Sequence, residues 1–79
     1  MDNRTKAVTV MLHNISYIKA NQLLNSCALP PDEHKLVLEH VVYRKNLSYL
    51  ADEMCVSYST AKRILKRALL KVWMTLNQT

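Results

Sequence analysis

Apolar side chains recur at three- and four-residue steps through most of this chain, a spacing that places them on one face of an α-helix. The first such stretch runs from Thr5 to Ser26. Its apolar stripe comprises Val8, Met11, Leu12, Ile15, Ile18, Leu23 and Leu24. Pro30 and Pro31 then end the stretch, because a residue that precedes proline is disfavoured in the helical conformation. The pattern therefore predicts a single N-terminal helix over residues 5–26.

A second helix is predicted over Pro31–Arg44. Proline is favoured in the first turn of a helix, and Asp32 and Glu33 place negative charge at the positive end of the helix dipole. The apolar residues of this segment are Leu36, Val37, Leu38, Val41 and Val42. Cations are favoured at the C-terminal end of a helix, where Lys45 follows Arg44.

Two capping residues mark the start of the remaining helices. Asn46 is a suitable N-cap for a short third helix over Leu47–Met54. Ser57 is a suitable N-cap for a fourth helix over Tyr58–Leu76, because its hydroxyl can accept a hydrogen bond from a backbone N–H of the first turn. The expected inward stripe of the fourth helix comprises Ala61, Ile64 or Leu65, Ala68, Leu69, Val72 and Leu76.

The composition favours an all-α fold. The chain has no glycine and only two prolines, so hairpin turns and phosphate-binding loops that depend on glycine are not expected. Its 79 residues are enough for one small domain with one core. We therefore expect a single all-α, four-helix domain over residues 1–79 that contains a helix-turn-helix. The N-terminal helix would enlarge the core or form a homodimer interface.

All of the net charge lies in the last part of the chain. The sequence has 11 Lys and Arg against 6 Asp and Glu, a formal net charge of +5. Residues 57–79 contain five cations and no acid, whereas residues 1–56 are neutral overall. The five cations are Lys62, Arg63, Lys66, Arg67 and Lys71. A basic segment of this kind favours a polyanionic partner, either nucleic acid or an anionic membrane surface.

The third and fourth predicted helices have the spacing of a helix-turn-helix motif. Leu50 and Met54 would face the core one turn apart, and Val56 would fill the turn. Ala51 is small enough to let the two helices approach closely. The second helix of such a motif enters the DNA major groove with its first turns.

The DNA-binding residues that this arrangement predicts lie at the start of the fourth helix. They are Ser57, Tyr58, Ser59, Thr60, Lys62, Arg63, Lys66 and Arg67. Those expected to face the groove are Ser59, Lys62, Arg63 and Lys66. Thr60 and Arg67 are expected beside the DNA backbone. Arginine suits bidentate recognition of guanine, and lysine suits phosphate.

A family resemblance lies in two segments, LPPDEHKLVL over Leu29–Leu38 and LADEMCVSYSTAKRI over Leu50–Ile64. They resemble region 4 of bacterial sigma factors and the small phage or mobile-element transcription regulators built on that domain, with the resemblance covering residues 29–76. It implies a transcription regulator that binds promoter-type double-stranded DNA through the Tyr58–Leu70 helix. The family's domain also contacts RNA polymerase. Docking on RNA polymerase or another regulator is therefore the alternative function, and the N-terminal helix is a further candidate surface for it.

The chain departs from the family's pattern in two ways. The family's turn usually has glycine where this chain has Cys55. A non-glycine residue in the left-handed region costs about 1 kcal/mol, so the turn is either strained at this residue or differently shaped. The polymerase-binding region 2 of a full sigma factor is not found in these 79 residues, so an autonomous sigma factor is not expected.

Other chemistry is not predicted. His13, His34 and His40 are not at metal-ligand spacing, and Cys27 and Cys55 are expected to be free thiols in a reducing cytoplasm. No glycine loop or paired nucleophile and base is found, so neither a cofactor nor enzymatic activity is expected. No apolar run approaches the roughly 20 residues of a membrane span, and the N-terminus lacks a secretory signal pattern. A cytoplasmic protein without a membrane partner is therefore expected.

Overall fold

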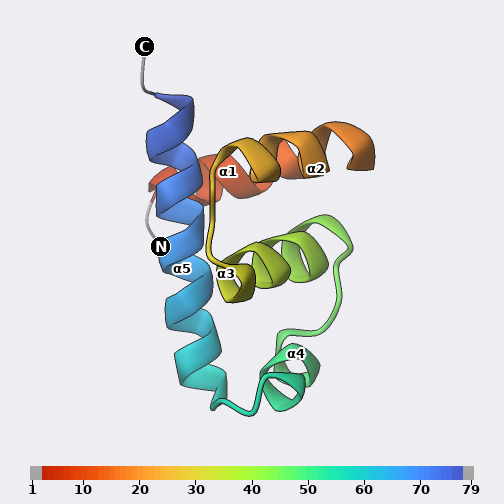
Figure 1. The fold of residues 1–79 in the computed structure, drawn as a ribbon, viewed down its shortest axis with the longest axis vertical. Helices are drawn as coiled ribbons and strands as arrows, with labels where there is room; N and C mark the ends of the chain where they lie inside the picture. Colours follow the sequence, from red (N-terminus) through yellow and green to blue (C-terminus); the bar gives the residue numbers. More distant parts are fainter. Residues whose placement is uncertain (1–2, 78–79) are drawn as a thin grey trace.

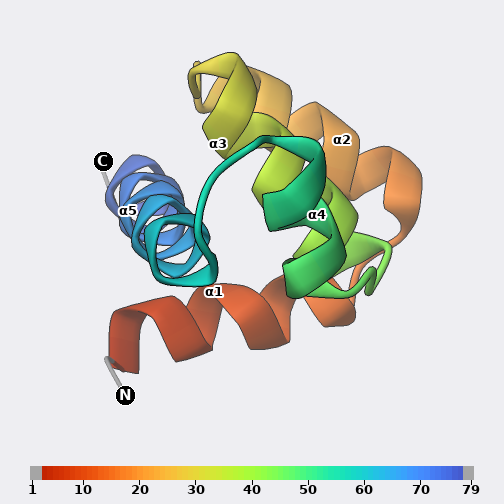
Figure 2. The same cartoon turned by 90° about the horizontal axis from the view of Figure 1, so that it is seen from below.

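The computed structural model describes residues 3–77, and within this range its regular structure is entirely helical (Figure 1). The expected all-α class is confirmed for these residues. The elements are α1 (Asn3–His13), α2 (Tyr17–Ser26), α3 (Pro31–Leu36), η1 (Val37–Val42), α4 (Leu47–Glu53) and α5 (Tyr58–Leu76). The longest helix, α5, runs along one side of the molecule, and Figure 2 shows α1 and α3 on different sides of it.

The expected single helix over residues 5–26 is wrong, and five α-helices are described in place of four. The chain leaves the helical conformation between His13 and Tyr17. Ser16 has an extended backbone (φ −68°, ψ 158°), and its side chain accepts a hydrogen bond from the N–H of Lys19. This is the geometry of an N-cap. The serine therefore starts a new helix where the apolar periodicity alone predicts a continuous one.

The break changes which residues of this stretch are buried. Val8 and Leu12 of α1 and Leu24 of α2 lie in the core, as expected. Ile18 is 72% exposed, although the continuous stripe would bury it. Because α2 starts after the break with a new direction, its buried face is formed by Ala20 and Leu24.

The helix predicted over Pro31–Arg44 is present, but it changes from an α-helix to a π-helix after Leu36. α3 continues into η1, a π-helical segment in which the N–H of Tyr43 donates to the carbonyl of Leu38, five residues earlier, at 2.9 Å. Arg44 then adopts the left-handed conformation (φ 60°). The N–H of Lys45 donates back to the carbonyl of Glu39 at 2.9 Å. The helical path therefore ends slightly before the predicted boundary.

Two hydrophobic clusters form the core. The larger joins α1, α2, η1 and the C-terminal half of α5, and its buried residues are Val8, Leu12, Ala20, Leu24, Val37, Val41, Val42, Ala68, Leu69 and Val72. The smaller joins α3, α4 and the start of α5, and its buried residues are Leu36, Leu47, Leu50, Ala51 and Ala61. The N-terminal segment thus enlarges the core, one of the roles considered for it. Leu76 is 40% exposed, so its expected place in the inward stripe is wrong.

Both N-caps predicted for the C-terminal helices are confirmed. The side-chain oxygen of Asn46 accepts from the N–H of Ser48 at 2.7 Å and of Tyr49 at 3.4 Å. The hydroxyl of Ser57 accepts from the N–H of Thr60 at 3.1 Å. As a result, α4 and α5 begin at the residues that the sequence predicts.

The turn after α4 has a standard helix-ending geometry with a cysteine at the position that usually holds glycine. The N–H of Cys55 donates to the carbonyl of Asp52 at 3.1 Å, and that of Val56 donates to Ala51 at 3.0 Å. These two hydrogen bonds define a Schellman motif. Cys55 adopts φ 58°, which costs a residue with a Cβ atom about 1 kcal/mol. The structure therefore shows strain at this cysteine and not a differently shaped turn.

Candidate functional site

Four cations lie on the exposed first turns of α5. None of them is paired with a carboxylate among residues 3–77. At about 100° per residue they span roughly 140° of the helix circumference. The fully buried Ala61 and Ala68 lie on the other side of the helix. We call this surface the basic face, and its residues are Lys62, Arg63, Lys66 and Arg67.

The four uncharged residues predicted at the site have two kinds of surroundings. Ser57 and Thr60 are bonded to each other, because the Ser57 hydroxyl also donates to Thr60 Oγ1 at 2.9 Å. Tyr58 and Ser59 are exposed. Lys62 Nζ lies 5.7 Å from the centre of the Tyr58 ring, within range of a cation–π attraction. Tyr58 and Ser59 thus border the basic face, whereas the other two stabilise the start of its helix.

Lys71 does not belong to the basic face, although it is one of the five cations of the basic C-terminal segment. Its ammonium group donates to Glu33 Oε2 at 3.0 Å. Glu33 belongs to α3 and is only 6% exposed. Its other oxygen, Oε1, is buried without a hydrogen-bond partner among the described residues. Lys71 therefore compensates a buried charge and connects α5 to α3.

Two other carboxylates, those of Glu39 and Glu53, form ion pairs with lysines outside α5. Glu39 of η1 accepts a hydrogen bond from Lys45 Nζ at 2.8 Å and lies 4.0 Å from Lys35 Nζ. Glu53 of α4 lies 3.6 Å from the same Lys35 ammonium. The hydrogen bond with Glu39 raises the pKa of Lys45 above its ordinary value. Opposite charges thus meet on α3, η1 and α4, and α5 keeps its first four cations uncompensated.

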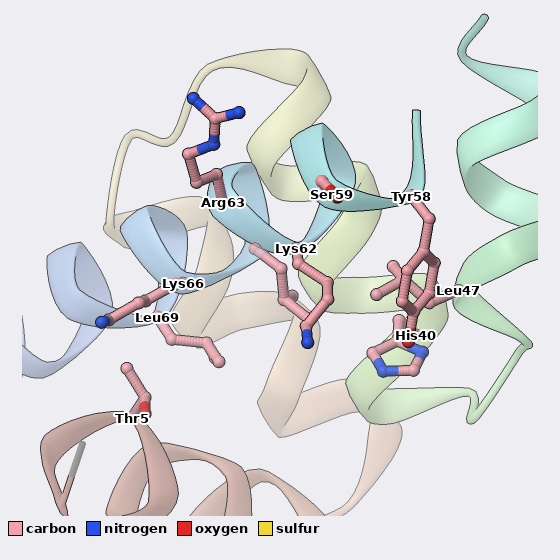
Figure 3. Close-up of a pocket in the computed structure, with 10 residues that line it drawn as sticks. Thr5, His40, Leu47, Tyr58, Ser59, Lys62, Arg63, Lys66 and Leu69 are labelled. Atoms are coloured by element: carbon pink, nitrogen blue, oxygen red, sulfur yellow. The ribbon is translucent and has the colours of Figure 1, made fainter. Parts of the chain in front are cut away.

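An open groove runs beside the basic face (Figure 3). Its walls come from the start of α5, from Thr5 of α1 and from His40 of η1. In the close-up, the Lys62 side chain points into the groove and the Arg63 side chain points away from it. The basic face therefore has one flank that borders a groove and an outer part that faces solvent.

Metal coordination finds no support in residues 3–77. Within that range, no three His, Cys, Asp or Glu side chains gather closely enough to hold an ion. None of the helices described in this range is both long enough and apolar enough to span a membrane.

The two cysteines differ in their surroundings. Both are free thiols. Burial raises the pKa of the Cys27 thiol, and a hydrogen bond with Thr75 partly opposes this effect. Cys55 lies exposed in the turn between α4 and α5. Because the thiolate is the reactive form, a raised pKa lowers the reactivity of the Cys27 thiol.

Comparison of the chain with protein-family models, curated proteins and solved structures gave no match. What the protein does must therefore be inferred from its own residues.

Proposed function

We propose that this protein is a sequence-specific, double-stranded DNA-binding transcriptional regulator whose recognition helix is α5. The observation that carries this proposal is the basic face. Its four cations have no carboxylate partner among the described residues, so their charge is available to an external polyanion. Ordinary surface helices gain stability from i,i+4 pairs of opposite sign, which α5 cannot form because it contains no acid. Concentrated, uncompensated positive charge on one helix is the electrostatic signature of nucleic-acid binding.

The arrangement of α4 and α5 supports the helix-turn-helix part of the proposal. The two helices pack through Leu50, Ala51 and Ala61, which are all buried. They meet at one end of the molecule, where the start of α5 is accessible beside α4 (Figure 1). A recognition helix of this class contacts base edges with its N-terminal residues. This is the part of α5 that carries the basic face.

The positions of the cations around α5 suggest different roles. Ser59 and Arg63 lie almost opposite the buried side of the helix, at about 100° per residue, and are placed to enter deepest into a major groove. Lys66 lies beside them. Lys62 and Arg67 lie on the two flanks and are placed to meet phosphates of opposite strands. Arg63 is then the principal base-reading residue, because its guanidinium can bond guanine at two atoms.

The resemblance to sigma factor region 4 extends the proposal to a biological setting. It suggests promoter-type DNA as the target and a small phage or mobile-element regulator as the type of protein, acting in the cytoplasm. The turn between α4 and α5 is compatible with this resemblance, because Cys55 occupies the left-handed position that suits the family's glycine.

The proposal is tested by selecting duplex fragments from a random pool with the purified protein and sequencing them. We expect a consensus of several base pairs, and a palindrome would also report a dimer. The four cations of the basic face should by themselves make binding to the selected duplex weaken with salt with a log–log slope of roughly −3 to −4, as about four phosphate-type contacts require. Arg63→Ala should relax the consensus at one or two base pairs, whereas Arg67→Ala should weaken all sequences alike. Recovery of no enriched sequence, together with salt-independent binding, would contradict the proposal.

A second candidate function, protein binding, is favoured by apolar exposure on α2. Tyr17 and Ile18 are 63% and 72% exposed. The Tyr17 ring packs edge-on against Tyr43 at 5.5 Å between ring centres, which stiffens this surface. RNA polymerase is the partner that the family resemblance suggests. A pull-down with polymerase, using wild type and Ile18→Ser beside a gel shift on the same proteins, separates the two functions.

A further inference from the structure

The groove beside the basic face continues past α5 into a second hollow. Both hollows are lined by Thr5, His40, Leu65 and Leu69, so they are parts of one groove, with volumes of about 540 and 550 Å³. One wall is the basic face of α5. The opposite wall is formed by α1 and by the end of η1, and it contributes two further cations, Lys6 and Arg44.

The groove lacks negative charge along the described residues that line it. Its charged side chains are Lys6 and Arg44 on one wall and Lys62 and Lys66 on the other, with Arg63 at the outer rim and pointing away. Lys6 and Arg44 are exposed, and neither is paired with a carboxylate among the described residues. Leu65 and Leu69 line both hollows between the two walls.

The backbone around Arg44 explains why this arginine is available and its neighbour is not. Arg44 takes the left-handed conformation at the end of η1. The next residue is held on both sides, because the Lys45 N–H donates to the carbonyl of Glu39 and the Lys45 carbonyl lies 2.7 Å from His40 Nδ1. Lys45 then pairs with Glu39. As a result of this turn, Lys45 pairs with Glu39, whereas Arg44 lies beside the groove.

We propose that this groove is a second phosphate-binding track, in which Lys6 and Arg44 bind the backbone of the DNA strand that passes the Lys62 flank of α5. The inference rests on the proposed function, because α5 must first occupy a major groove. The two DNA strands that border the major groove pass the two flanks of the inserted helix. The strand on the Lys62 side passes the opening of the protein groove, where its phosphates lie between the cations of the two protein walls. The N-terminal helix then serves DNA binding as well as the core.

The charge complementarity selects a phosphodiester backbone as the occupant. The charged side chains of both walls are all cations and the other lining residues are neutral, an arrangement that suits an extended row of anions. Because phosphate contacts carry no base information, Lys6 and Arg44 should add affinity and salt dependence but no sequence preference.

The test compares salt titrations of the wild type and K6A/R44A on the selected duplex, followed by fluorescence anisotropy. Each phosphate contact adds about 0.9 to the magnitude of the log–log slope, so with the second track the wild type should exceed the −3 to −4 expected from the basic face alone by roughly 2, and the double variant should fall back to that value. Between about 50 and 200 mM salt, its affinity should then fall about tenfold less than that of the wild type. Its selected consensus should be unchanged.

Two variants control for charge and folding. Lys19→Ala removes an exposed cation of α2 that lines neither hollow, and it should keep the wild-type slope. K6R/R44K retains both charges and should also keep it. Thermal unfolding followed by circular dichroism should place K6A/R44A close to the wild type, because both side chains are exposed.

Replacing single phosphates by neutral methylphosphonates locates the contacts. Substitutions on the strand beside the Lys62 flank should weaken the wild type but leave K6A/R44A unaffected. If the wild type binds its duplex and K6A/R44A keeps the full salt slope, the second track is excluded and the proposed function stands. If the wild type binds no duplex in a salt-dependent way, both proposals fail.

Discussion

The two halves of α5 differ in charge and in surroundings. Its first turns carry the basic face and rest on the smaller cluster. Its last turns contribute Ala68, Leu69 and Val72 to the larger cluster, against α1, α2 and η1. Both halves contain lysine, yet Lys66 is exposed without a carboxylate partner among the described residues, and Lys71 compensates the buried Glu33. The role of a cation in this helix is therefore decided by what the neighbouring helices place beside it.

The two halves of α5 also differ in how far the neighbouring helices enclose them. The C-terminal half packs against α1, α2 and η1 in the larger cluster, and Lys71 connects it to Glu33 of α3. The N-terminal half packs on α4 and on Leu36 of α3 in the smaller cluster, and Ser57 caps it. Because the first half is less enclosed, it is the part that can meet a large partner.

The largest expected effect is on DNA affinity, which substitutions in the first half of α5 should lower and a substitution in the second half should not. K62A/R63A/K66A should lower affinity for the selected duplex roughly 1000-fold, or about 4 kcal/mol, because it removes three charged contacts at once. Lys71→Ala should bind as tightly as the wild type once the folded fraction is taken into account. Fluorescence anisotropy measures both. Equal affinity of the triple variant and the wild type would mean that the basic face is only a solvated surface.

The next largest effect is on the free energy of unfolding, which should depend on the lysine in the second half of α5 and hardly on the lysine in the first. Lys71→Ala should reduce the free energy of unfolding by about 1–3 kcal/mol, because it leaves the buried Glu33 carboxylate without its compensating partner. Lys66→Ala should change it by less than about 0.5 kcal/mol, as an exposed surface substitution does. Urea unfolding followed by circular dichroism gives both values. K71A/E33Q should recover part of the loss, and an undiminished stability of Lys71→Ala would show that the pair contributes nothing.

A smaller effect concerns the turn that orients the first half of α5. Cys55→Gly should raise the free energy of unfolding by about 0.5–1 kcal/mol, because glycine adopts the left-handed conformation without a Cβ penalty but loses more entropy on folding. Cys55→Val should lower it, since a β-branched residue is least suited to this conformation. The same unfolding experiment applies. Destabilisation by glycine would argue that the cysteine side chain makes a contact worth more than its strain.

The smallest effect concerns the rates at which the two cysteine thiols are alkylated. A raised thiol pKa means a smaller thiolate fraction at a given pH, so alkylation of Cys27 should lag behind that of the exposed Cys55. The labelling of Cys27 should increase as the pH is raised from neutral towards alkaline. Mass spectrometry of the labelled protein distinguishes the sites, and the unfolded chain provides the control in which the difference disappears. Faster labelling of Cys27 in the folded protein would contradict its burial.

Prediction from the sequence succeeded best where the signal is local. The caps at Asn46 and Ser57 act through hydrogen bonds to residues two or three positions away, so residue type and spacing suffice to find them. The same reasoning could have found Ser16, whose capping signal lies inside an otherwise continuous apolar stripe. The change to a π-helix in η1 has no comparable signal in the residue pattern.

The candidate site was predicted in part. The basic face follows from the absence of acids in α5, which is a property of composition. The pairing of Lys71 with Glu33 joins residues 38 positions apart, and the placement of Lys6 and Arg44 on one groove joins α1 to the end of η1. Neither could be deduced from spacing along the chain.

For this protein, the amino-acid sequence alone determined the helical class, the starts of α3, α4 and α5, and the excess of positive charge on the last helix, because each depends on conformational preferences and charges within a few residues. Only the tertiary structure decided that α1 and α2 are separate helices with different buried faces, that one lysine of α5 compensates a buried carboxylate, and that two distant cations line the groove beside the basic face. These features depend on which surfaces meet when the helices pack, and packing is set by the shape and burial of the whole chain.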